Sequence, residues 1–571
     1  MNYLFIFLLF SFLGFSFQRS TPQDDHYVGA VVEYIVNGNV ATNLINYANL
    51  IQEAAEQGAD IVVFPEMTLT NDTTTFEVPI YGALREYPIP ALYPTHFDKY
   101  MVGISAAARQ NEIYVVINGR ELLDCRVQDT GEYCPEEKEY MFNTNVVFDR
   151  TGAVIDRYRK INLFGERSHT PALRPELGVF TTDFGVTFGH FICFDLKFQV
   201  PAVQVVQKRN VKNVIFPTRW LSELPYLTAV QIQEAYAYAL DVNFLGAGAN
   251  NVRLGSAGSG IYSGKAGALI SIMPGVPTTR LLVAKVPKVP GQVTEPYPGP
   301  IYDNPADHDN LRLIIDPSLK SHISRLLVPG AQEFTLVDRD VSCTFRVTLA
   351  QRDGSTYYRY RAGVFSGVRT YSGLATGGVR TCSVYACTGD SRDTCGLRFP
   401  TYIENATAIF QELTIVGTMP TPIRDTVVNA DDSIVYAVTS KVSIMPLESK
   451  EYVFSSIINN NATVTYTMTL NNQSAELYGF AIWGRRFATD GQVEDPPLSD
   501  EDGDVTPSPT TVSVPSAPTT VSVPSSPTTV TVPSASTTES VPVSTPSASV
   551  VHLLSRVLLA SMIALVCFSQ L

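Results

Sequence analysis

The chain is poor in basic and imidazole side chains. Its 571 residues include 41 Lys and Arg against 55 Asp and Glu, a net charge of −14, and only 7 His. No basic patch stands out, so the composition argues against nucleic acid as a partner. The histidines form no cluster, and the sequence has no glycine-rich phosphate-binding loop. No metal, nucleotide or other cofactor is therefore implied.

An apolar run stands at the N-terminus. Residues 4–16, LFIFLLFSFLGFS, are too few to span a bilayer comfortably and are followed by the polar stretch QRSTPQDD. This pattern predicts a secretory signal peptide over residues 1–19, rather than a buried helix, although no Lys or Arg precedes the run. We therefore expect an extracellular protein.

Residues 503–549 are rich in Ser, Thr, Pro and Val. The nine-residue unit TTVSVPSAP at 510–518 recurs twice with small changes. Such a composition cannot bury a core, and three short units without an apolar face do not build a solenoid. The segment is predicted to be an extended, O-glycosylated stalk.

The last residues, 550–571, predict a GPI-attachment signal. Their apolar part is short for a transmembrane helix and has no basic stop behind it. Small residues precede it at Ser547, Ala548 and Ser549, which are the candidates for the attachment region. We expect the mature protein to be held on the outer face of the plasma membrane, with a released, secreted form also compatible with the sequence.

Four sequons fit a secreted glycoprotein. The acceptor residues are Asn71, Asn405, Asn461 and Asn472. Each is a weak signal singly, because the motif is common by chance.

The cysteines leave one residue without a partner. Cys567 lies in the tail that anchoring would remove, which leaves an odd number in an oxidising compartment. Cys125 and Cys134 flank a short polar loop and are expected to pair. Four others are expected to pair among themselves, since no histidine lies near enough to complete a zinc site: Cys343, Cys382, Cys387 and Cys395. Cys193 remains.

The folded part divides into two domains. Over residues 25–315, strand-like apolar runs alternate with amphipathic segments such as 41–57 and 97–110, which predicts an α/β domain. Over residues 320–490, short runs divided by turn residues predict a mostly β domain containing the clustered disulfides. No chemistry is evident in this second domain.

Three residues of complementary chemistry follow strand-like runs in the first domain. They are Glu66 in IVVFPEMTL, Lys160 in VIDRYRKINLFGE and Cys193 in GHFICFDL. Ligand sites in α/β sheets gather at the carboxyl ends of strands, so the three are expected to converge. A carboxylate can deprotonate a thiol, and a fixed ammonium can stabilise the oxyanion that forms on attack at an amide. Singly, each residue also has a purely structural interpretation.

The stretches FPEMTL, YRKINLFGE and FICFDL, in this order and spacing, resemble the three signatures of the nitrilase superfamily of carbon–nitrogen hydrolases. VIFPTRWLSELPYL, VNFLGAGAN and GSGIY further resemble its vanin and biotinidase branch. The resemblance covers residues 25–280 and the second domain in outline. It implies a four-layer αββα sandwich, with Glu66 as general base, Lys160 as oxyanion stabiliser and Cys193 as nucleophile.

Four neighbouring residues need separate interpretation. Glu166 is either an accessory carboxylate, as in some relatives, or a structural residue. Trp220 either lines the substrate pocket or packs in the core. His190 is predicted to point to the opposite face of the strand from Cys193, and so to pack rather than act as the base of a Cys–His protease. Asp195 is predicted to lock the turn through hydrogen bonds.

By resemblance, the leading substrate is pantetheine, which would be hydrolysed to pantothenate and cysteamine. Release of biotin from biocytin is the close alternative, because the same three residues would serve either linear amide. The predicted GPI signal favours the first modestly. Two other possibilities stay open: a catalytically silent surface binding or adhesion protein, and transfer of the acyl group to an amine instead of water. No protein partner is inferred.

Overall fold

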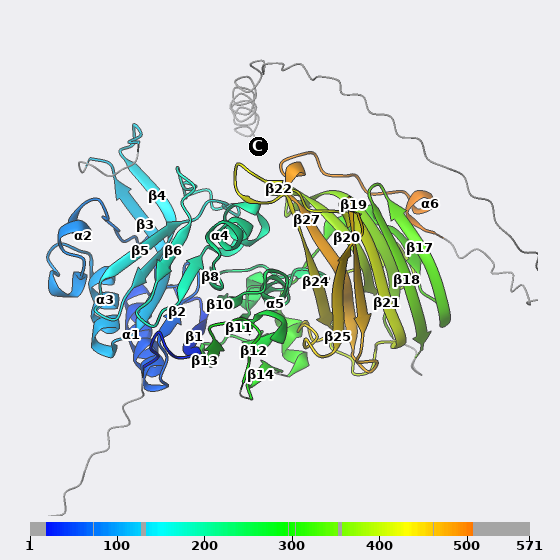
Figure 1. Ribbon diagram of the computed structural model, residues 1–571, viewed down its shortest axis with the longest axis horizontal. Helices are drawn as coiled ribbons and strands as arrows, with labels where there is room; N and C mark the ends of the chain where they lie inside the picture. Colours follow the sequence, from blue (N-terminus) through cyan, green and yellow to red (C-terminus); the bar gives the residue numbers. More distant parts are fainter. Residues whose placement is uncertain are drawn as a thin grey trace, which may run out of the picture. The chain divides into compact units, whose positions relative to one another are not determined.

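The computed structural model describes residues 19–505, except residues 72, 127–132, 295, 303, 352–356 and 461 (Figure 1). Outside them lie almost all of the predicted signal peptide, the stalk and the GPI-attachment region, together with five residues named above: Asn461, Ser547, Ala548, Ser549 and Cys567. Among the described sequons, Asn405 is exposed, whereas Asn71 and Asn472 are half-buried. None of the helices within the described residues has the length and apolar character needed to cross a bilayer.

The first domain contains a 13-stranded hydrogen-bonded system that forms two layers. In the first layer, β2 and β3 extend from β1 in parallel, and β4, β5 and β13 add antiparallel strands. The strands of this layer are β1 (His26–Ile35), β2 (Ile61–Val63), β3 (Tyr114–Asp124), β4 (Glu139–Phe148), β5 (Val154–Arg159) and β13 (Arg280–Pro287). Its outer helices are α1 (Val40–Glu56), α2 (Ala83–Glu86) and α3 (Lys99–Asn111).

The second layer runs in the order β6-β7-β8-β10-β11-β12-β14 and joins the first where β1 pairs with β10. Its strands are β6 (Gly178–Thr181), β7 (Thr187–His190), β8 (Asn213–Thr218), β10 (Asn243–Asn250), β11 (Ser259–Ser263), β12 (Ala268–Ile272) and β14 (Gly299–Ile301). Its helices are α4 (Gln204–Arg209) and α5 (Ala229–Leu240).

Alternate side chains of the strands face different layers. Val62 and Val115 pack with the residues of α1 and α3, whereas their neighbours Val63 and Val116 pack in the core between the two sheets, together with Ile215 of β8. Successive side chains of a strand point to opposite faces, so each sheet buries one face against helices and the other against its partner sheet. The predicted four-layer αββα sandwich is confirmed.

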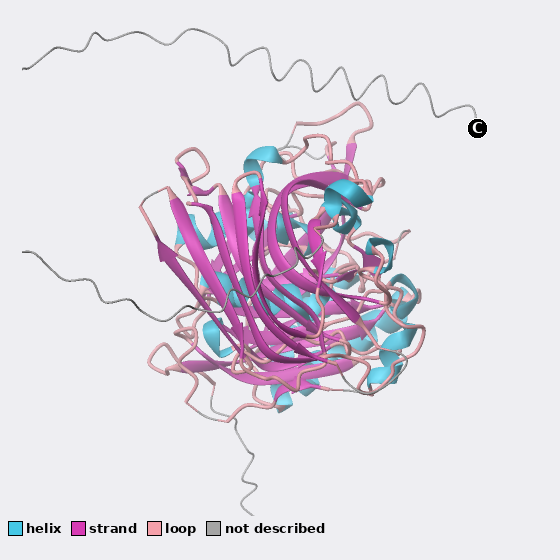
Figure 2. Ribbon diagram, turned by 90° about the vertical axis from the view of Figure 1, so that its right-hand side faces the viewer, coloured by secondary structure: helices cyan, strands magenta, loops and turns pink. Residues whose placement is uncertain are grey.

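The second domain, which faces the viewer in Figure 2, is a β-sandwich. Its two five-stranded sheets have the orders β16-β19-β20-β27-β24 and β17-β18-β21-β26-β25. Along β18 buried residues alternate with less buried ones, as expected of strands with one face on the core. The strands are β16 (Ile323–Leu326), β17 (Gly330–Asp338), β18 (Val341–Ala350), β19 (Arg359–Tyr371), β20 (Ala375–Cys387), β21 (Ile409–Pro420), β24 (Ser433–Lys441), β25 (Tyr452–Ile458), β26 (Thr463–Leu470) and β27 (Leu477–Arg486). Shorter elements are β9 (Glu223–Leu224), β15 (Ile314–Ile315), β22 (Arg424–Asp425), β23 (Ala430–Asp431) and α6 (Asp500–Gly503).

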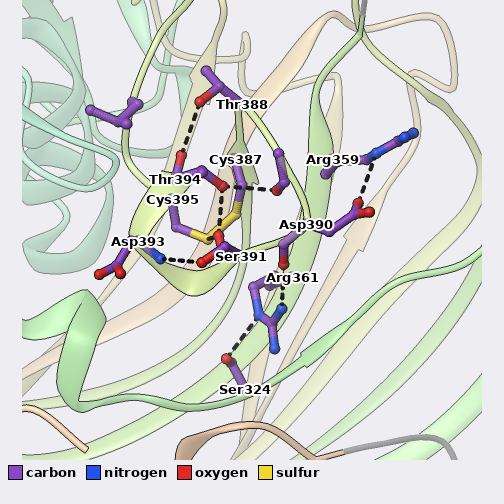
Figure 3. Close-up of a disulfide and its surroundings, with 12 residues drawn as sticks. Ser324, Arg359, Arg361, Cys387, Thr388, Asp390, Ser391, Asp393, Thr394 and Cys395 are labelled. Atoms are coloured by element: carbon purple, nitrogen blue, oxygen red, sulfur yellow. Dashed lines mark hydrogen bonds and ion pairs between the residues drawn. A yellow bond between two sulfur atoms is a disulfide. The ribbon is translucent and has the colours of Figure 1, made fainter. Parts of the chain in front are cut away.

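Two disulfides join the clustered cysteines of this domain, as predicted. Cys343 of β18 is bonded to Cys382 of β20, which ties the two sheets together. Cys387 is bonded to Cys395 and closes a short loop at the end of β20 (Figure 3). The mostly β, disulfide-containing second domain is therefore confirmed.

The disulfide predicted between Cys125 and Cys134 is not formed in the structure. Both residues are free thiols. Burial, a hydrogen bond with Cys134 and the charge interaction between the two groups raise the pKa of Cys125 to about 11. The two thiols thus interact without a bond between their sulfur atoms, which corrects the expectation drawn from spacing alone.

The two domains share one hydrophobic core. Phe194 and Trp220 of the first domain belong to the same buried cluster as Phe365, Tyr371 and Trp483 of the second. Polar contacts cross this boundary as well, because the Tyr226 hydroxyl is hydrogen-bonded to the Ser383 hydroxyl at 2.7 Å. The second domain is consequently part of the surroundings of the site described next.

Candidate active site

The three predicted residues converge and are all buried. Glu66 follows β2, Lys160 directly follows β5, and Cys193 begins a short 3-10 helix, Cys193–Lys197. Their exposed fractions are 2%, 1% and 6%. Because these groups are buried away from bulk water, the electrostatic interactions between them are stronger than at the protein surface.

Cys193 does not lie at the end of a strand as expected. The strand β7 ends at His190, and Cys193 has a left-handed backbone with φ of 47°. This region is uncommon for a residue with a side chain, and such residues cluster at functional sites. The sharp change of direction starts the 3-10 helix at the cysteine itself.

Lys160 connects two carboxylates. Its Nζ donates to Oε1 of Glu66 at 2.8 Å and to Oε1 of Glu166 at 2.7 Å. The side-chain amide of Asn143 donates to the same two oxygens, at 2.8 Å and 3.0 Å. The backbone N–H of Arg219 donates to the other oxygen of Glu66 at 2.7 Å. These donors fix the position of the Glu66 carboxylate.

Asn143 is a member of the site that the sequence analysis missed. Asn118 of β3 donates to the Oδ1 atoms of both Asn143 and Asn145 at 2.8 Å and 3.0 Å, and accepts from the backbone N–H of Met67 at 2.8 Å. This buried chain of amides orients the Nδ2 group of Asn143 toward Glu66. The available signal was FNTNVV, in which two amides stand two residues apart in an otherwise apolar strand.

Charges in the site leave the carboxylate ionised and the thiol protonated. Burial raises the pKa of Glu66, but the charge and hydrogen bond of Lys160 outweigh it, so the pKa is lower than usual. Burial and then the Glu66 charge raise the pKa of Cys193 to about 12, against a smaller opposing effect of Lys160. Burial lowers the pKa of Lys160, yet Glu66 and Glu166 hold it well above its usual value. The Cys193 thiol is hydrogen-bonded to Glu66.

Glu166 differs from Glu66 in its environment. Burial raises its pKa, Lys160 lowers it, and the charge of Glu66 raises it further, with a net upward shift. Within the described residues its Oε2 atom is buried without a hydrogen-bond partner. The residue is thus in direct contact with the site, rather than a surface carboxylate.

A narrow pocket opens over Cys193. From the first domain it is lined by Phe164, Phe194, Lys197, Arg219, Trp220, Leu221 and Glu223. Ile314, Tyr371 and Ser372 complete it, and the last two come from the second domain. Trp220 fits both interpretations, because it lines the pocket while its buried indole N–H donates to the Leu227 carbonyl at 2.9 Å.

His190 and Asp195 are structural, as predicted. The ring of His190 is fully buried and contacts Asp156 at 2.9 Å through Nε2. Asp195 accepts hydrogen bonds from the Tyr158 hydroxyl at 2.7 Å and from the Asn162 backbone N–H at 2.8 Å. These bonds tie the 3-10 helix to the segment that carries Lys160.

The αββα fold and a buried carboxylate–ammonium–thiol site together define a carbon–nitrogen hydrolase. A family model described as carbon-nitrogen hydrolase matches residues 28–263, and one described as the vanin C-terminal domain matches residues 313–490. Vanin-like protein 2 of Drosophila melanogaster is 33% identical over 510 residues, covering 85% of this chain and 94% of that protein. The chain belongs to the vanin family of carbon–nitrogen hydrolases.

Enzymes with named substrates are similar to the chain as well. Human biotinidase is 30% identical over 439 residues, covering 68% of this chain and 79% of that protein. Mouse pantetheinase is 30% identical over 398 residues, covering 66% of this chain and 74% of that protein. The two likenesses are equal in identity, so they do not distinguish the two substrates.

Proposed function

We propose that the chain hydrolyses a linear amide through a thioester on Cys193, with Glu66 as general base and acid and Lys160 as oxyanion stabiliser. The observation that carries the proposal is the position of the Glu66 carboxylate, which accepts hydrogen bonds from both the Cys193 thiol and the Lys160 ammonium. The three groups that the chemistry needs are therefore already in contact.

In the first half-reaction, the Cys193 thiol gives its proton to Glu66 while Sγ forms a bond to the amide carbonyl carbon. With a pKa of about 12, the thiol is protonated at rest, so proton transfer has to accompany the attack. The oxyanion that forms is stabilised by the Lys160 ammonium. Glu66 then returns the proton to the leaving amine, and the C–N bond breaks to leave the thioester.

In the second half-reaction, Glu66 takes a proton from water as the water oxygen attacks the thioester carbonyl. Collapse of this intermediate breaks the C–S bond and releases the acid, and the proton on Glu66 returns to the sulfur. Glu166 and Asn143 are assigned the role of holding Lys160 and Glu66 in position. Glu166 accepts a hydrogen bond from the Lys160 ammonium, and Asn143 donates to the carboxylates of both Glu66 and Glu166. Acyl transfer to an amine would use the same thioester.

Pantetheine is our proposed substrate, on the likeness to the mouse pantetheinase, and biocytin is the alternative, on the likeness to the biotinidases. We also propose that the protein acts at the extracellular face of the plasma membrane as a glycosylated, GPI-anchored enzyme. The N-terminal apolar run, the two disulfides and the C-terminal small and apolar residues support this location.

The test uses the purified protein and its Cys193→Ala variant, incubated with pantetheine and with biocytin. We expect cysteamine release from pantetheine by the parent protein and none by the variant. Lysine release from biocytin instead would assign the alternative substrate. If the folded parent protein releases neither amine, these two substrates are ruled out and a silent surface role gains support.

A further inference from the structure

Lys197 is a buried lysine in the pocket that the proposed mechanism does not use. It is the last residue of the 3-10 helix that begins at Cys193, it lines the pocket over that cysteine, and its exposed fraction is 7%. Lysine is almost never buried unless its ammonium is paired. The contacts of this ammonium therefore show what the pocket wall offers to a ligand.

Aromatic rings surround the Lys197 ammonium. Its Nζ lies 4.0 Å from the centroid of Tyr371, 5.2 Å from that of Trp220 and 5.9 Å from that of Phe194. These distances are within the range of cation–π attraction, which stabilises a cation less than an ion pair with hydrogen bonds does. Among the residues that the structure describes, no carboxylate lies within ion-pair distance of this Nζ.

Glu223 and Asp316, the two carboxylates whose charges act on Lys197, are already paired with an arginine. Arg369 of β19 forms a two-pronged ion pair with Glu223, and it contacts Asp316 at 2.7 Å. Asp316 also accepts from the backbone N–H and the hydroxyl of Ser318, at 2.8 Å and 2.7 Å. Neither carboxylate is available to move toward Lys197 without breaking these contacts.

The pocket wall is consequently short of negative charge. Burial lowers the pKa of Lys197 to about 7; Glu223 opposes this shift, and Arg369 and Arg485 add to it. Arg219 lines the same pocket and adds a second cation to the wall. An anion entering the pocket would supply the acceptor that the ammonium lacks and would offset the cost of its burial.

We propose that Lys197 is a specificity-determining residue that lets the site accept amide substrates besides pantetheine, by binding an anionic group, a carboxylate or a similar oxyanion, near the scissile carbonyl. The inference rests on the proposed amide hydrolysis and extends it to a further class of substrate. Pantetheine is neutral and would leave the Lys197 ammonium without an anionic partner, so the added class is amides whose acyl group carries a carboxylate. The rings of Tyr371, Trp220 and Phe194 hold the ammonium in the wall of the pocket that Cys193 also lines.

The test compares two ligands of the same shape, N-methylglutaramate, which carries a carboxylate, and its neutral carboxamide. Their affinities are measured by titration calorimetry with the Cys193→Ala protein, which cannot turn them over. A charge-assisted hydrogen bond predicts a Kd about tenfold or more lower for the anionic ligand. Adding Lys197→Met should bring the ratio of the two Kd values close to one, and Lys197→Arg should restore much of it.

Lys208→Met is the matched control, because it removes an exposed lysine outside the pocket, and it should leave the ratio unchanged. A ratio near one in the parent protein would overturn the proposal, as would a preference that survives Lys197→Met. If Lys197→Met fails to unfold cooperatively, Lys197→Gln replaces it. Binding is read without turnover, so a failure of this inference is distinct from a failure of amide hydrolysis, which the amine-release assay detects.

Discussion

Replacing Glu66 by Gln should change two properties of Cys193 in opposite directions. The variant keeps the shape of the side chain but removes the charge that, after burial, contributes most to the raised pKa of the thiol. Two unit charges about 4 Å apart interact by about 4 kcal/mol at an effective dielectric constant of about 20, and about 1.4 kcal/mol corresponds to one pKa unit. Losing a third of such an interaction raises the thiolate fraction near neutral pH by about tenfold.

The assay follows two rates in the same samples. Alkylation of Cys193 by iodoacetamide, read from the mass of the Cys193 peptide because Cys125 and Cys134 are also free thiols, should become about tenfold faster. Amide hydrolysis should fall by about 10² to 10⁴-fold, because no group remains to accept the proton. Exposed Glu176→Gln should change neither rate. If alkylation slows together with hydrolysis, Glu66 supports the structure of the site and the reasoning is refuted.

Three further outcomes follow from the same contacts. The acid limb of kcat/KM should lie below pH 4.5, the pKa of an ordinary glutamate, because Lys160 outweighs burial and lowers the pKa of Glu66. The ionised base is then lost only as the pH falls through this lower pKa, and an acid limb above pH 4.5 would contradict the assignment. Asn143→Ala should lower kcat by about tenfold or more and the free energy of unfolding by about 1 to 3 kcal/mol, because it removes a buried donor shared by two carboxylates. The value of kcat is measured by amine release, and an unchanged kcat would exclude a positioning role. Arg369→Met should reduce the free energy of unfolding, measured by urea denaturation, by about 3 to 5 kcal/mol, since it leaves buried carboxylates unpaired. The control Arg359→Met breaks a more exposed ion pair and should cost about 0 to 1 kcal/mol, so equal losses in the two variants would refute the argument.

The residues that the sequence could place are those set by local pattern. Glu66 and Lys160 each follow an apolar strand, and strand ends meet at one edge of a sheet, so their convergence could be expected before the fold was known. For Cys193 the pattern predicts a strand end, because FICF continues the apolar run of β7. The strand instead ends at His190, and the left-handed backbone at Cys193 starts a helix that no alternation of apolar residues could indicate.

The sequence could not place residues whose role in the site depends on contacts between distant segments. Asn143 lies within a buried strand, where an amide resembles an ordinary core residue until its partners Asn118 and Glu66 are known. The spacing of Cys125 and Cys134 was compatible with a disulfide, yet spacing does not determine whether two thiols in contact are bonded. In both cases the outcome depends on distances between side chains that are set only when the chain has folded.

The second domain contributes to the pocket as well as supporting it. Tyr371 of β19 faces the Lys197 ammonium, and Arg485 of β27 donates from Nε to the Lys197 carbonyl at 2.9 Å. Arg369 of the same domain neutralises Glu223 on the pocket wall. Without these three side chains the first domain would keep its thiol, carboxylate and ammonium but lose one wall of the pocket and the clamp on the end of the nucleophile's helix. The proposed catalytic groups thus belong to the first domain, while both domains form the pocket in which we propose that the substrate is selected.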